Sequence, residues 1–228
     1  LSQVQLDGIS ATFFIAGLLS WLPGLVVDRM GTKFSMAAGG LFGALFTMAY
    51  WIVACKLIVV SHVVPLLSVL AVCICLNCAL IIGSTFKLTL ICGGTGTSGA
   101  AVGVAKGFVG LGAGLYACIF QAFRTTHESS LDFLPVVATF FIICAAMPAL
   151  LLLPTKQQVA SYPVKSETTP LHFRIMYTSL VALGIVIVGT SLSDLADKKK
   201  KAGIHHQQYG KIALILTLWL GSITAFLF

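Results

Sequence analysis

Residues 24–33 read Gly-Leu-Val-Val-Asp-Arg-Met-Gly-Thr-Lys, a short charged stretch that joins two long apolar ones, 8–27 and 35–55. A helix needs about 20 mostly apolar residues to cross a hydrocarbon core of about 30 Å, and each apolar stretch has that length. Gly24 and Gly31 permit a tight reversal of the backbone and a close contact between helices. The pattern predicts two membrane-spanning helices joined by a short loop.

The rest of the chain has the same character. Of its 228 residues, 58% are hydrophobic and only 9% are charged, and the mean hydropathy is +1.01. These values exclude a soluble globular domain. The apolar stretches do not alternate with polar residues, so they predict helices and not the strands of a barrel. The predicted fold class is all-α, that of a polytopic membrane protein.

Seven segments are long and apolar enough to span the bilayer. Their predicted bounds are 8–27, 35–55, 60–82, 100–122, 133–153, 174–193 and 210–228. We divide the chain into an amino-terminal bundle (1–154), a cytoplasmic loop (155–172) and an additional two-helix hairpin (173–228). Because residue 1 is Leu and the chain stops within an apolar run, the sequence is expected to be a fragment.

Neither the cysteines nor the positive charge predicts a cofactor or a nucleic-acid partner. Most of the seven cysteines lie within predicted spans, and Cys73, Cys75 and Cys78 form the tightest group. In an apolar helix Cys is far more often a small packing residue than a ligand, and no His or carboxylate lies nearby to complete a zinc site. The largest part of the net charge of +7 is the run Lys198–Lys201, which predicts a solvated or membrane-surface loop. The expected surroundings are the lipid bilayer.

The charged loop supplies the first candidate functional residues. They are Gly24, Asp28, Arg29, Gly31 and Lys33. Asp28 lies where a helix ends, so it can accept hydrogen bonds or face a neighbouring helix N-terminus, while Arg29 and Lys33 mark the cytoplasmic side. Such charged bonds can hold one conformation and release it in another, because breaking them costs only a few kcal/mol. The loop predicts a gate, with a plain solvated anchor as the alternative.

The same loop resembles a known signature. Its spacing, Gly-x-x-x-Asp-Arg-x-Gly-x-Lys from Gly24 to Lys33, is similar to the loop between the second and third helices of the major facilitator superfamily, although Thr32 stands where that family usually has Arg. Residues 1–6, Leu-Ser-Gln-Val-Gln-Leu, and residues 99–114, with a Lys-Gly-Phe-x-Gly-Leu core, narrow the resemblance to the nodulin-like branch. The resemblance covers nearly the whole chain.

This resemblance implies a carrier of a small solute. By it, residues 1–154 hold helices two to six, and the first helix and the second six-helix half lie outside the given sequence. In such transporters two halves rock around a substrate site near the bilayer midplane. The missing second half and an unknown small solute are therefore the expected partners, and the host membrane, plasma or organellar, stays open.

One feature departs from the family pattern. Where relatives carry an Arg-Asn-Phe-Pro loop before the fifth helix, this chain has Cys-Gly-Gly-Thr-Gly-Thr-Ser-Gly at residues 92–99. In superfamily members a basic residue there can pair with the Asp of the signature loop. A latch built on Asp28 would therefore need Lys87 as its substitute.

Glycines recur along the predicted fifth helix of the superfamily bundle. The stripe consists of Gly99, Gly103, Gly107, Gly110 and Gly114. Small residues at this spacing let two helix backbones approach closely in lipid, where packing drives association. The smooth face could slide against the opposite half of a carrier, or it could pack statically within one bundle.

Three polar residues within the spans are candidates for a pathway. Lys106 would cost about 3 kcal/mol or more if it faced lipid, so it either faces protein or water, where it could attract an anion or couple protons, or it snorkels to the cytoplasmic surface. Snorkelling is the favoured interpretation. Asn77 and Gln121 could line the pathway or make hydrogen bonds between helices.

A transporter that works by alternating access is the leading functional hypothesis. The alternative is a membrane scaffold that anchors partners without transport. An enzyme is the weakest hypothesis, because the sequence shows no Ser-His-Asp set, no His-Glu-x-x-His motif and no paired aspartates inside a span. One conflict concerns topology: with residues 28–34 in the cytoplasm, the run Lys198–Lys201 falls outside, whereas the positive-inside rule places it in the cytoplasm.

Overall fold

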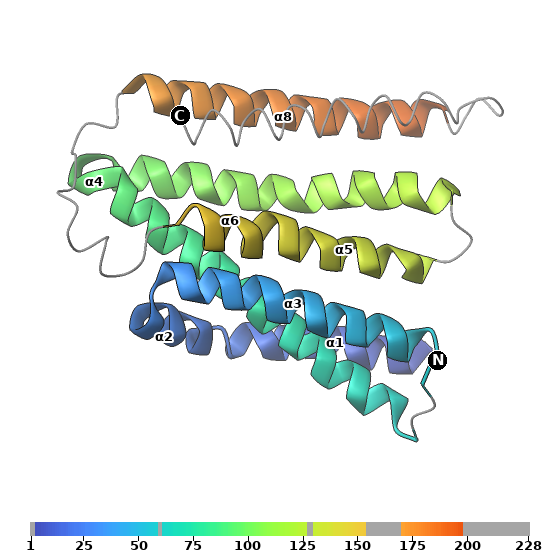
Figure 1. The fold of residues 1–228 in the computed structure, drawn as a ribbon. Helices are drawn as coiled ribbons and strands as arrows, with labels where there is room; N and C mark the ends of the chain where they lie inside the picture. The colour runs from blue at the N-terminus through green and yellow to red at the C-terminus, as the bar shows by residue number, and fades with distance from the viewer. Residues whose placement is uncertain (1–2, 59–60, 127–129, 154–169, 198–228) are drawn as a thin grey trace. The chain divides into compact units, whose positions relative to one another are not determined.

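Helices make up the described part of the chain, which a computed structural model defines for residues 3–58, 61–126, 130–153 and 170–197 (Figure 1). No strand occurs within these residues, and the predicted all-α fold class is confirmed. In chain order the elements are α1 (Gln3–Leu18), α2 (Trp21–Met30), α3 (Thr32–Ala54), α4 (Val63–Thr126), the 3-10 turn η1 (Ser130–Asp132), α5 (Phe133–Phe141), the π-helical turn η2 (Ile142–Ala146), α6 (Met147–Leu151) and α8 (Pro170–Asp197).

Four helical segments within the described residues are long and apolar enough to cross a membrane. They are Thr32–Ala54, Val63–Ile91, Gly99–Gln121 and Ser130–Leu151. The bent pair α1 and α2 supplies a fifth if it counts as one span. These five correspond to the first five predicted spans. The sixth, 174–193, lies within α8, a helix of 28 residues whose described apolar part is Tyr177–Gly189. The seventh, 210–228, lies outside the described residues.

The first predicted span, 8–27, is not one straight helix. α1 and α2 meet at a bend of 46°. Just after the break, the Leu22 N–H donates to the Leu19 carbonyl, three residues earlier, at 3.0 Å. Pro23 explains it, because proline has no N–H to donate and its ring clashes with the carbonyl four residues earlier, here that of Leu19. The predicted span 8–27 is therefore a broken helix.

α4 is longer than either span predicted within it. The sequence predicted separate spans at 60–82 and 100–122, but the backbone is helical from Val63 through Thr126. A straight helix of these 64 residues would measure about 96 Å, three times the hydrocarbon thickness, so its two apolar segments count as two crossings. Residues 92–98 contain no proline, and every residue there keeps its N–H for helical hydrogen bonds. The non-helical connection that we predicted there is therefore wrong.

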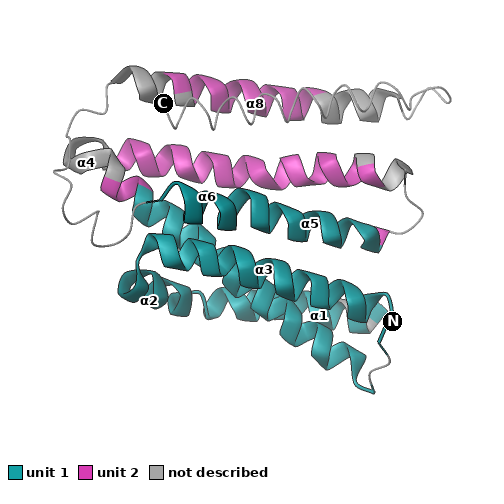
Figure 2. Cartoon of the chain, in the orientation of Figure 1, with its two compact units in different colours: residues 1–88, 131–163 teal, residues 89–130, 164–228 magenta. Residues whose placement is uncertain are grey.

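Contacts divide the chain into two compact units, which Figure 2 shows in different colours. Unit 1 comprises residues 1–88 and 131–163, and unit 2 comprises residues 89–130 and 164–228. The predicted division into a bundle, a loop and a hairpin rests on expected membrane topology and not on contacts, and it stays a prediction.

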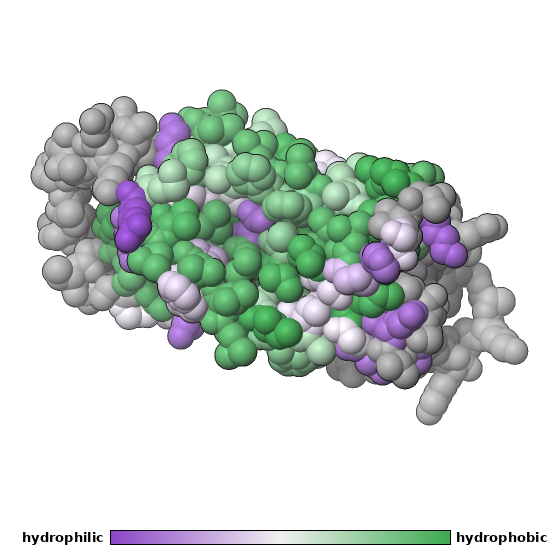
Figure 3. Space-filling model, turned by 90° about the horizontal axis from the view of Figure 1, so that it is seen from below, coloured by the Kyte–Doolittle hydropathy of each residue, from purple (hydrophilic) through white to green (hydrophobic). Residues whose placement is uncertain are grey.

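Large apolar side chains are exposed along the described helices. Phe14 is 81% exposed, Leu18 79% and Ile185 67%. Figure 3 shows apolar residues over the middle of one face, with hydrophilic residues gathered toward its ends. Soluble monomers rarely expose contiguous apolar surface on this scale. The surface fits helices that are surrounded by lipid.

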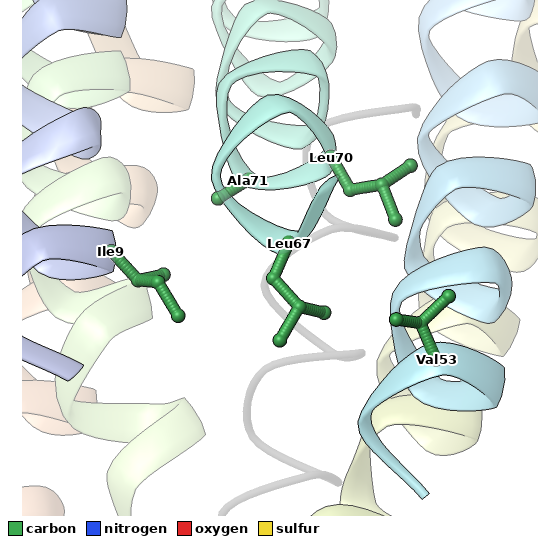
Figure 4. Close-up of a cluster of buried hydrophobic side chains, with 5 residues drawn as sticks. All are labelled: Ile9, Val53, Leu67, Leu70 and Ala71. Atoms are coloured by element: carbon green, nitrogen blue, oxygen red, sulfur yellow. The ribbon is translucent and has the colours of Figure 1, made fainter. Parts of the chain in front are cut away.

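The buried residues of unit 1 join three helices. Ile9 of α1, Val53 of α3, and Leu67, Leu70 and Ala71 of α4 form one apolar cluster (Figure 4). Burial of such side chains is worth more for tight packing than for exclusion of water, because the surrounding lipid is itself apolar. The cluster holds the middle of α1 and the end of α3 against the start of α4.

Two glycines let α3 lie directly against the span Ser130–Leu151. A Cβ atom on Gly40 would lie 2.6 Å from the backbone nitrogen of Ala146, and one on Gly43 would lie 2.6 Å from the Phe141 ring. Ala146 ends the π-helical turn η2, two residues before Pro148. A widened turn before a proline relieves the clash between its ring and the preceding carbonyls. Gly40 therefore lies against the backbone at the end of this turn.

Candidate gating site at the junction of α2 and α3

A single residue separates α2 from α3. α2 ends at Met30 and α3 begins at Thr32, so most of the predicted loop 24–33 is helical. Gly31 makes the reversal with φ 88° and ψ 164°, a backbone conformation that is essentially confined to glycine. Its N–H donates to the Val27 carbonyl at 3.1 Å and closes the last turn of α2. The prediction of a tight reversal is confirmed, and the predicted length of the loop is wrong.

Lys87 of α4 reaches the end of α2. Its Nζ lies 2.6 Å from Asp28 Oδ1, and it also donates to the Val27 carbonyl at 3.4 Å. A cation suits this place, because the last carbonyls of a helix carry partial negative charge. Lys87 is therefore the partner that an Asp28 latch requires, although 59 residues separate the two in sequence.

This ion pair is only partly shielded from water. The Asp28 side chain is 73% exposed and the Lys87 side chain 34% exposed. Exposed pairs of this kind stabilise a fold by about 0–1 kcal/mol. Arg29 is exposed beside them and Lys33 is half-buried, so the junction carries three cations and one carboxylate. A bond this weak can be broken and remade without unfolding the helices that it joins.

Small and hydroxyl side chains lie on the helices behind the ion pair. Thr32 is 8% exposed, Ser35 0% and Ser84 1%. The Ser84 hydroxyl donates to the Leu80 carbonyl at 2.7 Å, whereas Ser35 Oγ has no hydrogen-bond partner within the described residues. Gly39, one turn after Ser35, would place a Cβ atom 2.9 Å from Ile81 of α4. α3 and α4 thus pack closely from the latch inward.

The five glycines of the stripe do not share one environment: three of them contact α8, and two do not within the described residues. Gly107 lies directly under Leu180 and Gly114 lies under Ile187, both of α8; the ideal Cβ position of Gly114 is 3.1 Å from the Ile187 side chain. Gly103 lies 3.3 Å, measured in the same way, from the Tyr177 hydroxyl. These contacts fall within unit 2, around the buried side chains of Leu115, Leu183 and Ile187. Gly99 and Gly110 have no neighbour within 4 Å among the described residues.

The three pathway candidates lie on α4, Asn77 in unit 1 and the other two in unit 2. Lys106 and Gln121 are exposed. Asn77 is half-buried, and its amide donates to the Cys73 carbonyl at 2.8 Å within α4. That bond stays within one helix, so it is not the interhelical bond that we predicted for Asn77.

Sequence reasoning missed the glycines of α3. Gly39 and Gly43 are four residues apart in an apolar span, and Gly40 lies between them. This spacing is the same signal that drew attention to residues 99–114. Among the described residues, no three His, Cys, Asp or Glu side chains are placed to hold a metal ion.

Long apolar helices, an apolar outer surface and charges gathered at a helix junction define a polytopic helical membrane protein. The chain belongs to the Nodulin-like family, whose model matches residues 1–221. This family is of the membrane-transporter type and is related to the major facilitator superfamily. No curated protein and no solved structure matches the chain.

Proposed function

We propose that this chain forms part of a carrier that moves a small solute by alternating access, and that Asp28 and Lys87 form its cytoplasmic latch. One observation carries the proposal: the 2.6 Å ion pair ties the last turn of α2 to α4 at a junction of a single residue. The family supports the transporter class. The latch holds one state, and its loss shifts the population toward the other.

The arrangement of α2 suits a moving part. A bend of 46° separates it from α1, and Gly31 alone separates it from α3. Its end is held by Lys87 through one carboxylate and one carbonyl. Because the pair contributes about 1 kcal/mol or less, solute binding can supply the free energy that breaks it.

The test measures opening directly and needs no identified solute. In a background without other cysteines, Ser35→Cys reports opening, because this side chain is fully buried while the latch is closed. Asp28→Asn is expected to raise its rate of labelling by a water-soluble maleimide about fivefold, the equivalent of about 1 kcal/mol. The double variant Asp28→Lys with Lys87→Asp restores the pair and should return the rate toward that of the parent.

Lys56→Gln is the matched control, because it removes an exposed cation beyond the opposite end of α3. Solute flux in vesicles containing the full-length protein is then measured with a panel of small organic anions and metal-linked solutes. Unchanged labelling in Asp28→Asn, or an equal rise in the Lys56→Gln control, would count against the latch. Flux that is indifferent to every one of these variants would favour the scaffold.

A further inference from the structure

One buried hydroxyl behind the latch has no hydrogen bond. Ser35 lies in the first turn of α3 and is 0% exposed, and its Oγ has no partner among the described residues. Its backbone is satisfied, because the Ser35 N–H donates to the Gly31 carbonyl at 3.1 Å. Within the described part of the chain, the other buried side-chain atom of this kind is Trp51 Nε1, near the far end of α3.

The tight reversal at Gly31 explains why this hydroxyl is unpartnered. Buried hydroxyls inside the helices donate to the carbonyl four residues earlier, as those of Thr47 and Ser84 do at 2.7 Å. The carbonyl four residues before Ser35 belongs to Gly31, whose φ of 88° and ψ of 164° lie outside the helix. Ser35 therefore lacks the acceptor that a hydroxyl in the interior of a helix uses.

Two contacts bracket Ser35 between α3 and α4. On the side of the junction, Lys87 of α4 holds Asp28 at 2.6 Å. One turn beyond Ser35, an ideal Cβ atom on Gly39 would lie 2.9 Å from Ile81 of α4. All of these residues belong to unit 1. The Ser35 side chain therefore stays enclosed as long as both contacts hold.

Closing the latch thus has a cost as well as a gain. Burial of a hydroxyl without a partner costs more free energy than an exposed ion pair contributes, and the Asp28–Lys87 pair is of the exposed kind. Water can satisfy the Ser35 hydroxyl only when α3 and α4 separate. The closed state is therefore less stable than its ion pair alone would make it.

We propose that the Ser35 hydroxyl biases the junction of α2 and α3 toward opening, against the Asp28–Lys87 pair. The inference rests on the latch proposed above and adds the group that opposes it. Ser35 acts through the equilibrium between the closed and open states, as a positioning residue, and not through contact with the solute. Removal of its hydroxyl should therefore favour the closed state.

The test follows the accessibility of a second buried position. In a background without other cysteines, Ser84→Cys is the reporter, because Ser84 is 1% exposed and lies on α4, three residues before Lys87. In the full-length protein in membranes, Ser35→Ala is expected to slow labelling by a water-soluble maleimide about fivefold or more. The same change should raise the midpoint of thermal unfolding in detergent, because it removes an unpartnered buried group.

Thr47→Val is the matched control. Thr47 lies on the same helix, is 1% exposed and donates to the Gly43 carbonyl at 2.7 Å, so valine removes a buried hydroxyl that has a partner and keeps the branched shape. This variant should leave the labelling rate unchanged and should not raise the unfolding midpoint. Ser35→Ala is also combined with Asp28→Asn, which opens more often, and should return that rate toward the parent value.

Several outcomes overturn the proposal. A raised midpoint with unchanged labelling would make Ser35 a static packing defect. A lowered midpoint or faster labelling would mean that the hydroxyl stabilises the closed state, and equal slowing in Thr47→Val would mean that position 35 is not special. Failure of the latch is distinguishable: Asp28→Asn would then leave labelling unchanged while Ser35→Ala still slowed it.

Discussion

Asp28 is significant because of its position and not because of the strength of its bond. A carboxylate at the C-terminal end of a helix opposes the partial charge of the last carbonyls, so on its own it weakens α2. Lys87 offsets the charge of the carboxylate and the partial charge of the carbonyls, since it contacts Asp28 and the Val27 carbonyl. The end of α2 thus carries an unfavourable charge that a cation from a neighbouring helix must neutralise. The state of the Asp28–Lys87 pair therefore shows whether α2 and α4 are in contact.

Gly31 gives the first prediction. Gly31→Ala forces a Cβ atom into a conformation that costs about 1–3 kcal/mol for other residues, because φ is 88° there. We expect a lower midpoint of thermal unfolding, measured in detergent by fluorescence-detected size exclusion. Gly24→Ala is the control: Gly24 lies inside α2 with nothing within 4 Å, so alanine there should be neutral or slightly stabilising. Equal losses in both variants would contradict the role of backbone conformation at Gly31.

The positions of proline and glycine in unit 1 determine where its helices break and how closely they pack. Pro23 breaks the first span, and Pro148 follows the π-helical turn in the span Ser130–Leu151. Gly40 and Gly43 place α3 against that turn with no side chain between. None of these residues carries charge, yet they decide how the helices meet.

Contact between α3 and η2 gives the second prediction. Gly40→Ala should destabilise the protein by about 1–3 kcal/mol, because the new Cβ atom would meet the backbone of Ala146 and of Phe141, at 2.6 and 2.9 Å. Backbone at this distance cannot turn aside as a long side chain can. Gly83→Ala is the control, since its Cβ atom would meet only Val27, at an ordinary 3.8 Å. The same detergent melting assay compares the two, and equal stability would refute the close approach.

The break between α1 and α2 gives the third prediction. Pro23→Ala restores the missing N–H and removes the ring, so the bend of 46° should lessen. Spin labels at the exposed positions Gln3 and Met30 are then expected to move apart by about 3–5 Å, as helix geometry requires when the segment straightens. Double electron–electron resonance measures this distance. Pro65→Ala, in the first turn of α4 where proline is tolerated, should leave it unchanged; an unmoved distance in Pro23→Ala would assign the bend to tertiary contacts.

At the scale of the whole molecule, the chain consists of two compact units that share α4. Unit 1 holds the latch and the α3 glycines, and unit 2 holds the glycine stripe under α8. Each unit has its own buried cluster. Local stability can therefore differ between them, since proteins open in cooperative parts.

Hydrogen exchange provides the fourth prediction. Gly40→Ala should speed amide exchange in α3 and α5 while leaving α8 unchanged, because its contacts lie in unit 1. Gly107→Val should do the reverse, because the Cβ atom at that position already meets Leu180 of α8. Mass spectrometry of peptides from residues 32–54 and 177–189 separates the effects. A uniform rise in exchange along the chain for either variant would mean that the units do not open separately.

The amino-acid sequence by itself determined the class of protein and the number and approximate places of its first five spans, because burial in lipid demands long apolar helices. It also indicated the reversal near Gly31 and named Lys87 as the partner that Asp28 would need. The spans and the reversal rest on composition and on residues close in sequence, whereas Lys87 was suggested by the family resemblance.

Tertiary structure alone decided which helices touch. It joined Lys87 to Asp28 across 59 residues, placed Gly40 against Ala146, and turned Gly103, Gly107 and Gly114 toward α8 while Gly99 and Gly110 stayed without a neighbour among the described residues. In lipid every apolar face has nearly the same affinity for its surroundings, so hydrophobicity does not select a partner. The shape of the helix surfaces selects the partner, and that shape exists only in the folded chain.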